Sequence, residues 1–232
     1  MEEISAKIDA SYENFWAKQS SNLVYPTEFV VRVFLAAYPG LNFPKPKAGD
    51  RVLDVAFGDG RNTSFLCDQG FLVSGIEITQ GIVDHTSERL KAIGHYPDLR
   101  VGRNSRIPFD NEYFDSVLAC HCCYYCDEGE TFADNMREYS RIIKPGGWLV
   151  ASIADIKSYI FDSATLLADG SFRIVKDPYQ NRLGYRLHGF SSPDEIESCL
   201  SHWYTNFSFG YAANDFFGID ERLHWIVCQK KD

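Results

Sequence analysis

The sequence predicts a single α/β domain built on a doubly wound, mostly parallel β-sheet. Apolar, strand-like runs alternate with helical segments across residues 51–153, and this alternation is typical of parallel strands joined by helical crossovers. Residues 52–60 pass from β-branched residues straight into glycines, which favours a buried strand over a buried helix. Two strand-like segments at about 204–211 and 222–229 lie too close together for a helical crossover, so we expect an antiparallel pair there.

Two helices are predicted in front of the sheet. Apolar and aromatic residues recur at helical spacing within residues 4–19. After a polar break, Pro26 precedes a second helix that ends before Pro39. We therefore expect residues 1–40 to form a helical segment ahead of the main domain, which we assign to residues 48–232.

Residues 51–153 supply the strands and helices of the predicted parallel sheet. The last of these helices is expected to stop at a Lys144-Pro-Gly-Gly turn, because proline and glycine do not continue a helix. The predicted strands are residues 51–56, 71–76, 99–102, 113–120 and 148–153, and the predicted helices are residues 61–69, 80–93 and 130–143.

The last third of the chain changes character. We expect residues 158–190 to be an irregular insertion, with Asp169-Gly170 as a hairpin turn. Ser191-Ser-Pro-Asp-Glu then begins a helix, because a cap residue and first-turn carboxylates stand in the favoured places.

Composition disfavours several classes of partner. The chain has 232 residues, a net charge of −9 and no run of lysine or arginine, which disfavours nucleic acid. No stretch approaches the roughly 18 consecutive apolar residues that a membrane span needs. Seven cysteines without the spacing of a disulfide scaffold predict reduced thiols and a cytoplasmic protein.

A nucleotide-type site is predicted where the first two strands end. Asp54 lies in the first strand, Gly58 and Gly60 lie in the turn after it, and Glu77 follows the second strand. Ligands of parallel sheets bind beyond these strand ends, and glycines let the backbone approach them closely. A carboxylate there can accept hydrogen bonds from two ribose hydroxyls, each worth roughly 1.5–3 kcal/mol. These features fit any adenosine-containing cofactor and leave both NAD and S-adenosylmethionine open.

Two details favour S-adenosylmethionine. A dinucleotide fingerprint has a third glycine three positions after Gly60, where this chain has Thr63. Asp59 also places a negative charge in the turn. That charge would repel a pyrophosphate but not a ligand that carries an ammonium group and a sulfonium.

Five motifs follow one another in order within residues 50–155. They are Asp54-x-Ala56-x-Gly58-x-Gly60, Glu77 at the end of a strand, Ile107-Pro-Phe, Phe114-Asp115 and Lys144-Pro-Gly-Gly. In order and spacing they resemble the motifs of class I S-adenosylmethionine-dependent methyltransferases, in particular the small-molecule branch. The resemblance implies a seven-stranded, mostly parallel sheet with a terminal antiparallel strand. It also implies S-adenosylmethionine as cofactor and S-adenosylhomocysteine as product.

The resemblance also implies which residues contact the cofactor. Ala56 replaces the family's first glycine, and we expect a negative φ there. Arg103 replaces an aspartate near the adenine amino group and cannot accept a hydrogen bond, so the side-chain oxygen of Asn104 is the expected acceptor. Ile78 would pack on the adenine face. The implied contacts are Asp54, Ala56, Gly58, Gly60, Glu77, Ile78, Arg103, Asn104, Ser105 and Cys120.

His121 is the candidate general base, because it follows the fourth predicted strand and has an ordinary pKa of about 6.5. Methyl transfer mainly requires alignment of the acceptor, and a base is needed only where a proton must leave early. The alternative interpretation is that His121 contacts the cofactor or fills the loop. Tyr124 and Tyr125 are candidates for the acceptor pocket or for core packing.

The cysteines around His121 could suggest zinc, but the first of them lies on a predicted buried strand. Position 129 is Gly, so the spacing also misses the pattern of radical enzymes that use the same cofactor. We interpret these cysteines as small buried apolar residues and predict no metal site.

Two further candidates for acceptor binding lie outside the sheet. In the resembling enzymes the N-terminal region often folds over the site as a lid, so Tyr25 and the aromatic residues before it are expected to exclude water. Asp215, between the last two strands, is expected at the acceptor entrance.

The function predicted is transfer of a methyl group from S-adenosylmethionine to oxygen or nitrogen of a small molecule. Two alternatives stay open, a nicotinamide-dependent oxidoreductase and a non-catalytic protein that binds S-adenosylmethionine.

Overall fold

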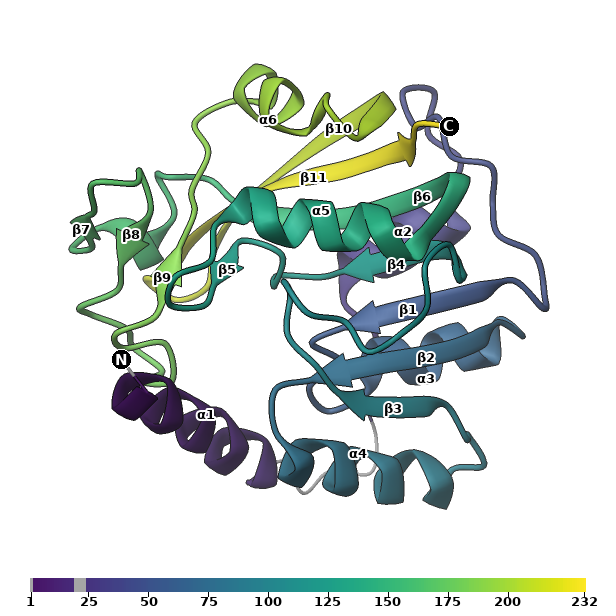
Figure 1. Cartoon of the computed structure of the whole chain (residues 1–232), viewed down its shortest axis with the longest axis horizontal. Helices are drawn as coiled ribbons and strands as arrows, with labels where there is room; N and C mark the ends of the chain where they lie inside the picture. The colour runs from purple at the N-terminus through teal and green to yellow at the C-terminus, as the bar shows by residue number, and fades with distance from the viewer. Residues whose placement is uncertain (1, 19–23) are drawn as a thin grey trace.

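A seven-stranded β-sheet forms the centre of the computed structural model, which describes residues 2–18 and 24–232 (Figure 1). The strand order is β10-β11-β6-β4-β1-β2-β3. Five neighbouring strands, β6, β4, β1, β2 and β3, run parallel to one another. Strand β11 pairs antiparallel with both β6 and β10. The predicted fold class is confirmed. The strands are β1 (Arg51–Val55), β2 (Leu72–Glu77), β3 (Asp98–Val101), β4 (Phe114–Ala119), β6 (Ile143–Ala154), β10 (Tyr204–Asp215) and β11 (Asp220–Lys230).

Helices cover both faces of the sheet because its central strands are apolar on both sides. Neighbouring residues of β1 join different apolar clusters, Leu53 on the α5 and α6 face and Val52 on the α2 and α3 face. Both side chains are completely buried. The helices are α1 (Glu2–Ala17), α2 (Glu28–Leu35), α3 (Arg61–Asp68), α4 (Gln80–Ala92), α5 (Phe132–Ile142) and α6 (Pro193–Leu200).

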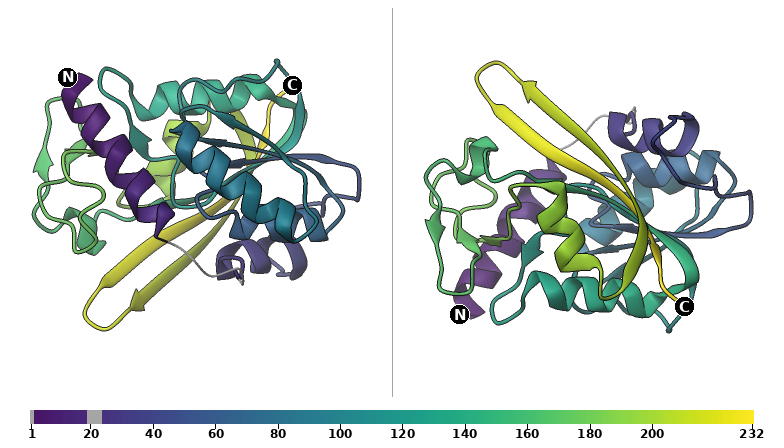
Figure 2. Two further views of the ribbon diagram at one scale, coloured as in Figure 1. Left: turned by 90° about the horizontal axis from the view of Figure 1, so that it is seen from below. Right: turned by 90° about the horizontal axis from the view of Figure 1, so that it is seen from above.

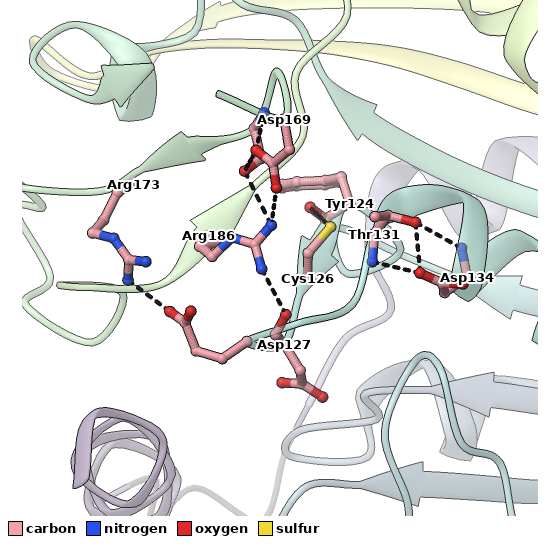
Figure 3. Close-up of polar contacts among 10 residues, drawn as sticks. Tyr124, Cys126, Asp127, Thr131, Asp134, Asp169, Arg173 and Arg186 are labelled. Carbon is pink, nitrogen blue, oxygen red and sulfur yellow. Dashed lines mark hydrogen bonds and ion pairs between the residues drawn. The ribbon is translucent and has the colours of Figure 1, made fainter. Parts of the chain in front are cut away.

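Side-chain caps define where three of the helices begin. Thr79 accepts from the backbone of α4, and Ser192 accepts from that of α6, one residue before Pro193. At α5, Thr131 and Asp134 form a reciprocal capping box, which Figure 3 shows. The predicted start of α6 in the Ser191-Ser-Pro-Asp-Glu segment is confirmed.

The expected Lys144-Pro-Gly-Gly turn is wrong, because these residues form the irregular beginning of β6. Ile143 already pairs with Phe114, and regular pairing resumes only at Trp148. Gly146 has a φ of 72°, which interrupts the extended conformation of β6 between Ile143 and Trp148.

Residues 158–190 are not simply irregular, because they contribute to a second, four-stranded sheet of order β5-β9-β8-β7. Its strands have two residues each, too short for an alternating pattern to be visible in the sequence. The hairpin turn at Asp169-Gly170 is confirmed, since β7 and β8 pair on either side of it. The elements are β5 (Tyr125–Cys126), η1 (Tyr159–Phe161), β7 (Thr165–Leu166), β8 (Phe172–Arg173) and β9 (Arg186–Leu187).

Arg186 holds this small sheet together from within. Its guanidinium donates to the backbone carbonyl of Asp127 at 3.0 Å and forms an ion pair with Asp169 in the hairpin turn (Figure 3). The Arg186 side chain is almost fully buried. The small sheet is thereby fixed beside the loop that follows β4.

The β10–β11 hairpin extends well beyond the rest of the molecule (Figure 2). It is longer than predicted at the turn, where only residues 216–219 lie between the two strands. Elsewhere in the described part of the chain, no helix is both long and apolar enough to cross a membrane.

Candidate functional site

A cavity of about 490 Å³ lies at the carboxyl ends of β1, β2 and β4. Its walls include Ala56 after β1, Glu77 at the end of β2 and Cys120 after β4. Helix α1 contributes further aromatic side chains, among them Tyr12 and Trp16. The cavity thus occupies the place where parallel sheets bind their ligands.

The turn after β1 approaches the cavity with left-handed backbone at three alternate positions. Ala56, Gly58 and Gly60 have φ values of 55°, 54° and 75°. The expectation of a negative φ at Ala56 is therefore wrong, and this alanine adopts the conformation that glycine favours. Gly58 also needs its small size, because a Cβ there would lie 2.5 Å from the ring of Trp16.

Glu77 closes this turn from the neighbouring strand. Its carboxylate accepts hydrogen bonds from the backbone N–H of Gly58 at 3.1 Å and of Ile78 at 2.8 Å. A carboxylate has about four acceptor sites, so two remain for a pair of hydroxyls. Burial raises the pKa of Glu77 to about 7, and the two N–H groups oppose that rise.

Asp54 supports the turn from behind rather than lining the cavity. It is completely buried and accepts a hydrogen bond from the hydroxyl of Thr63 at 2.7 Å. Burial raises its pKa to about 7. Gly60 and Ser105 also lie outside the cavity lining. These three predicted contacts are therefore not brought to the cavity surface.

Asp59 does not present a free negative charge in the turn. Arg61 donates to both of its carboxylate oxygens, and Arg89 lies 4.0 Å from one of them. The argument that Asp59 would repel a pyrophosphate is therefore wrong, because two guanidinium groups balance its charge.

Arg103 and Asn104 line the cavity but are engaged with other parts of the protein. Arg103 forms ion pairs with Asp9 of α1 at 2.5 Å and with Asp127 at 3.0 Å. The side-chain oxygen of Asn104 accepts the hydroxyl proton of Tyr139 at 2.8 Å. The oxygen expected to accept from adenine thus already has one donor, and Asp127 is a carboxylate on the cavity wall that sequence reasoning missed.

His121 lines the cavity in a strained conformation, with a φ of 58°. Its backbone N–H donates to the hydroxyl of Ser152 at 2.8 Å. Burial lowers the pKa of His121 below its usual value, an effect that Glu221 opposes and Arg182 adds to. The imidazole is therefore neutral at pH 7 and able to accept a proton.

The cysteines near His121 are packed in the protein. Cys122 and Cys123 direct their thiols to backbone carbonyls, and burial raises the pKa of Cys120 to about 12. Within residues 2–18 and 24–232, no group of three or more potential ligands could hold a metal ion.

Beyond His121 the cavity is walled by tyrosines. Tyr124 and Tyr125 line it, as their positions after β4 suggested. Tyr25 is 75% exposed and lies outside the lining, as does Asp215, whose carboxylate accepts from the N–H of Gly218 in the hairpin turn. Sequence reasoning missed several lining residues from the second sheet and from β11, namely Tyr159, Tyr179, Asn181, Arg182, Tyr185 and Glu221.

The fold, the glycine turn and the carboxylate at the end of β2 together define the class I methyltransferase architecture. Residues 53–151 match a family model described as a methyltransferase domain. The chain therefore carries a class I S-adenosylmethionine-dependent methyltransferase domain, and the recognition made from its motifs is confirmed.

Curated relatives match mainly this central part. A demethylmenaquinone methyltransferase of Tropheryma whipplei (strain Twist) is 30% identical over 103 residues, 44% of this chain and 41% of that protein. A ubiquinone biosynthesis O-methyltransferase of Maricaulis maris is 25% identical over 69% of this chain and 61% of that protein. The match thus spans about two fifths of the first of these relatives.

Two similar solved structures match nearly the whole chain. The 1,6-didemethyltoxoflavin-N1-methyltransferase of Burkholderia thailandensis, solved with bound 1,6-didemethyltoxoflavin and S-adenosylhomocysteine, has a TM-score of 0.67 at 15% identity. The match covers 100% of this chain and 90% of that one. The N-methyltransferase NodS of Bradyrhizobium japonicum, solved with S-adenosylhomocysteine, has a TM-score of 0.64 at 13% identity and covers 97% and 100%. These likenesses establish that the fold extends beyond the matched domain.

Proposed function

We propose that this protein transfers the methyl group of S-adenosylmethionine to an oxygen or nitrogen atom of a small molecule in the cytoplasm. The observation that carries the proposal is the carboxylate of Glu77, which lines the cavity beside the glycine turn with acceptor sites to spare. This arrangement suits the two hydroxyls of a ribose.

The residues present fit the cofactor. Glu77 would hold the ribose, Ile78 and the strand ends would contact the adenine, and Ala56 to Gly58 would face the methionine portion. When bound, S-adenosylmethionine supplies an activated methyl group, so that the protein mainly has to orient the acceptor. The aromatic side chains of α1 that line the cavity would help to exclude water from this space.

His121 would take the proton of the acceptor. The neutral imidazole would accept the proton of the hydroxyl or amine as the acceptor's lone pair bonds to the methyl carbon and the carbon–sulfur bond breaks, with S-adenosylhomocysteine as the leaving group. The lowered pKa keeps His121 in the unprotonated form that this step needs. General-base catalysis of this kind typically contributes about 10²–10⁴ in rate.

A small acceptor suits both the cavity and the charge of the chain. A volume of about 490 Å³ lies within the range of small-molecule sites. The net charge of −9 does not favour a polyanion such as nucleic acid. The ubiquinone biosynthesis O-methyltransferase supports oxygen as acceptor, the named structural neighbours support nitrogen, and both are retained.

The proposal is tested with S-adenosylmethionine labelled in its methyl group and a panel of hydroxy- and amino-aromatic compounds, analysed by mass spectrometry. We expect one methyl group to appear in a panel member. We expect His121→Ala to lower turnover about 10²-fold while its affinity for S-adenosylhomocysteine stays within about twofold. His95→Ala, at a histidine paired with Asp68 outside the cavity, is the control. Equal turnover of His121→Ala and the wild type would show that His121 is not the general base. Absence of methyl transfer to any acceptor of the panel would contradict the proposal.

A further inference from the structure

The part of the cavity beyond His121 has its own wall, which we call the acceptor chamber. It is formed by the loop after β4, by the second sheet and its loops, and by the start of β11. Its residues are Tyr124, Tyr125, Tyr159, Tyr179, Asn181, Arg182, Tyr185 and Glu221. A chamber with so many aromatic rings suits a flat aromatic molecule.

The loop at residues 177–182 is built around one buried carboxylate. Asp177 accepts from the backbone N–H groups of Tyr179, Asn181 and Arg182 at 3.0–3.2 Å. The guanidinium of Arg182 adds two further bonds, from Nε at 3.2 Å and from Nη2 at 3.0 Å. The Asp177 side chain is completely buried, so this network fixes the loop before any ligand arrives.

This network presents two donors to the chamber. Arg182 uses Nη2 also for the hydroxyl of Tyr159 at 2.9 Å, but its Nη1 has no hydrogen-bond partner among the described residues and is not sealed from solvent. Asn181 is buried, and its side-chain oxygen is sealed from solvent with no hydrogen-bond partner; its amide nitrogen also has no partner among those residues but is not sealed. A guanidinium nitrogen and an amide, adjacent in the chain, are thus left for a ligand.

Glu221 and His121 supply hydrogen-bond acceptors to the chamber, whereas its tyrosine hydroxyls can both donate and accept. Glu221 carries a negative charge there, and His121 is neutral. Both would attract a hydroxyl or an amine, and Glu221 would repel an anion. The chamber therefore offers donors for an anionic oxygen at Asn181 and Arg182, and acceptors for a group that gives up a proton at Glu221 and His121.

We propose that the methyl acceptor is an aromatic acid, whose carboxylate is held by Arg182 and Asn181 and whose hydroxyl or amine lies toward His121. The inference rests on the proposed function, because it names the substrate class of the same site. Arg182 is suited to the task, since its planar guanidinium is already oriented by Asp177 and loses little freedom on binding.

The experiment compares para-hydroxybenzoate with para-hydroxybenzamide by calorimetry, with and without saturating S-adenosylhomocysteine. These two probes share the ring and the hydroxyl and differ in the anionic oxygen. We expect the acid to bind at least about tenfold more tightly than the amide. Acid that binds no more tightly than the amide, or no binding of the acid, would overturn the proposal.

Two variants test whether Asn181 and Arg182 cause the preference for the acid over the amide. Asn181→Ala removes one donor without touching the Asp177 network, and Arg182→Lys keeps the ion pair while losing the free guanidinium nitrogen. Each should reduce the preference for the acid about three- to tenfold. Arg137→Gln, on the exposed surface of α5, should leave it unchanged. An unchanged preference in both chamber variants would contradict the assignment.

The same titrations separate this proposal from the proposed function. If S-adenosylhomocysteine binds and the acid is not preferred, only the substrate class is wrong. If S-adenosylhomocysteine does not bind, the proposed function fails, and the acid-to-amide comparison on the ligand-free protein still decides the role of the chamber.

Discussion

Ala56 is a strained residue at the centre of the site. Its φ of 55° places it in the left-handed region, where an L residue other than glycine loses roughly 1–2 kcal/mol. The strand next to it imposes this conformation, since the N–H groups of Ala56 and Phe57 both donate to the carbonyl of Ile76. The protein thus keeps the backbone of a glycine turn without its first glycine.

Replacing Ala56 with glycine should stabilise the protein. We expect Ala56→Gly to raise the free energy of unfolding by roughly 0.5–1 kcal/mol, because relief of strain exceeds the entropy that glycine adds to the unfolded chain. Chemical denaturation provides the measurement. Ala133→Gly, within helix α5, should instead lower the free energy of unfolding by about 1 kcal/mol. Loss of stability in both variants would show that position 56 is not strained.

Glu77 links cofactor binding to pH. Burial raises its pKa to about 7, so near that pH much of the ligand-free protein holds a proton on this carboxylate. Ribose hydroxyls donate to the ionised form, and their binding therefore releases the proton. It follows that affinity for a nucleoside cofactor rises with pH through about 7 and levels off above it.

Helix α1 is fastened over the site at three places. Asp9 pairs with Arg103, the hydroxyl of Ser11 donates to the carbonyl of Gln180 at 3.4 Å, and Tyr12 packs edge-on against Tyr185. Figure 2 shows α1 running along one side of the molecule toward the second sheet. The arginine that departs from the family pattern thus ties this helix to the cofactor end of the cavity.

Removing that ion pair should loosen α1. We expect Asp9→Ala to lower the hydrogen-exchange protection of α1 amides about three- to tenfold, because a partly buried ion pair contributes about 1 kcal/mol to the closed position. Asn14→Ala, on the exposed side of the same helix, is the control. Equal protection in the two variants would mean that Arg103 does not hold the helix.

At the scale of the whole molecule, the part of the site at the strand ends was predictable, including His121, Tyr124 and Tyr125, whereas the wall from the second sheet was not. Glu77 and the glycine turn directly follow apolar strands that the sequence reveals. Because the carboxyl ends of parallel strands lie at the same edge of the sheet, these residues are expected at the ligand site. Arg182 lies in a segment with no periodicity, whose strands have two residues each. Its position depends on Asp177 and on pairing with the distant β5, which no local pattern indicates.

The β10–β11 hairpin also shows what local sequence patterns do not predict. Its antiparallel pairing was predicted from the short loop, but the strands extend further than their apolar residues suggest. The extension carries Asp215 to the tip, away from the cavity, and leaves Glu221 on its wall. Because the strands are a few residues longer than predicted, Glu221 rather than Asp215 is the acidic residue of the hairpin that lines the cavity.

Calorimetric titration with S-adenosylhomocysteine at about pH 6 and about pH 8 tests the central claim most directly. We predict specific binding that is tighter at the higher pH, and a loss of roughly 2–4 kcal/mol in Glu77→Ala together with loss of the pH effect. NAD should not compete. Tight binding of NAD, or an affinity for S-adenosylhomocysteine that Glu77→Ala leaves unchanged, would contradict the assignment of this site.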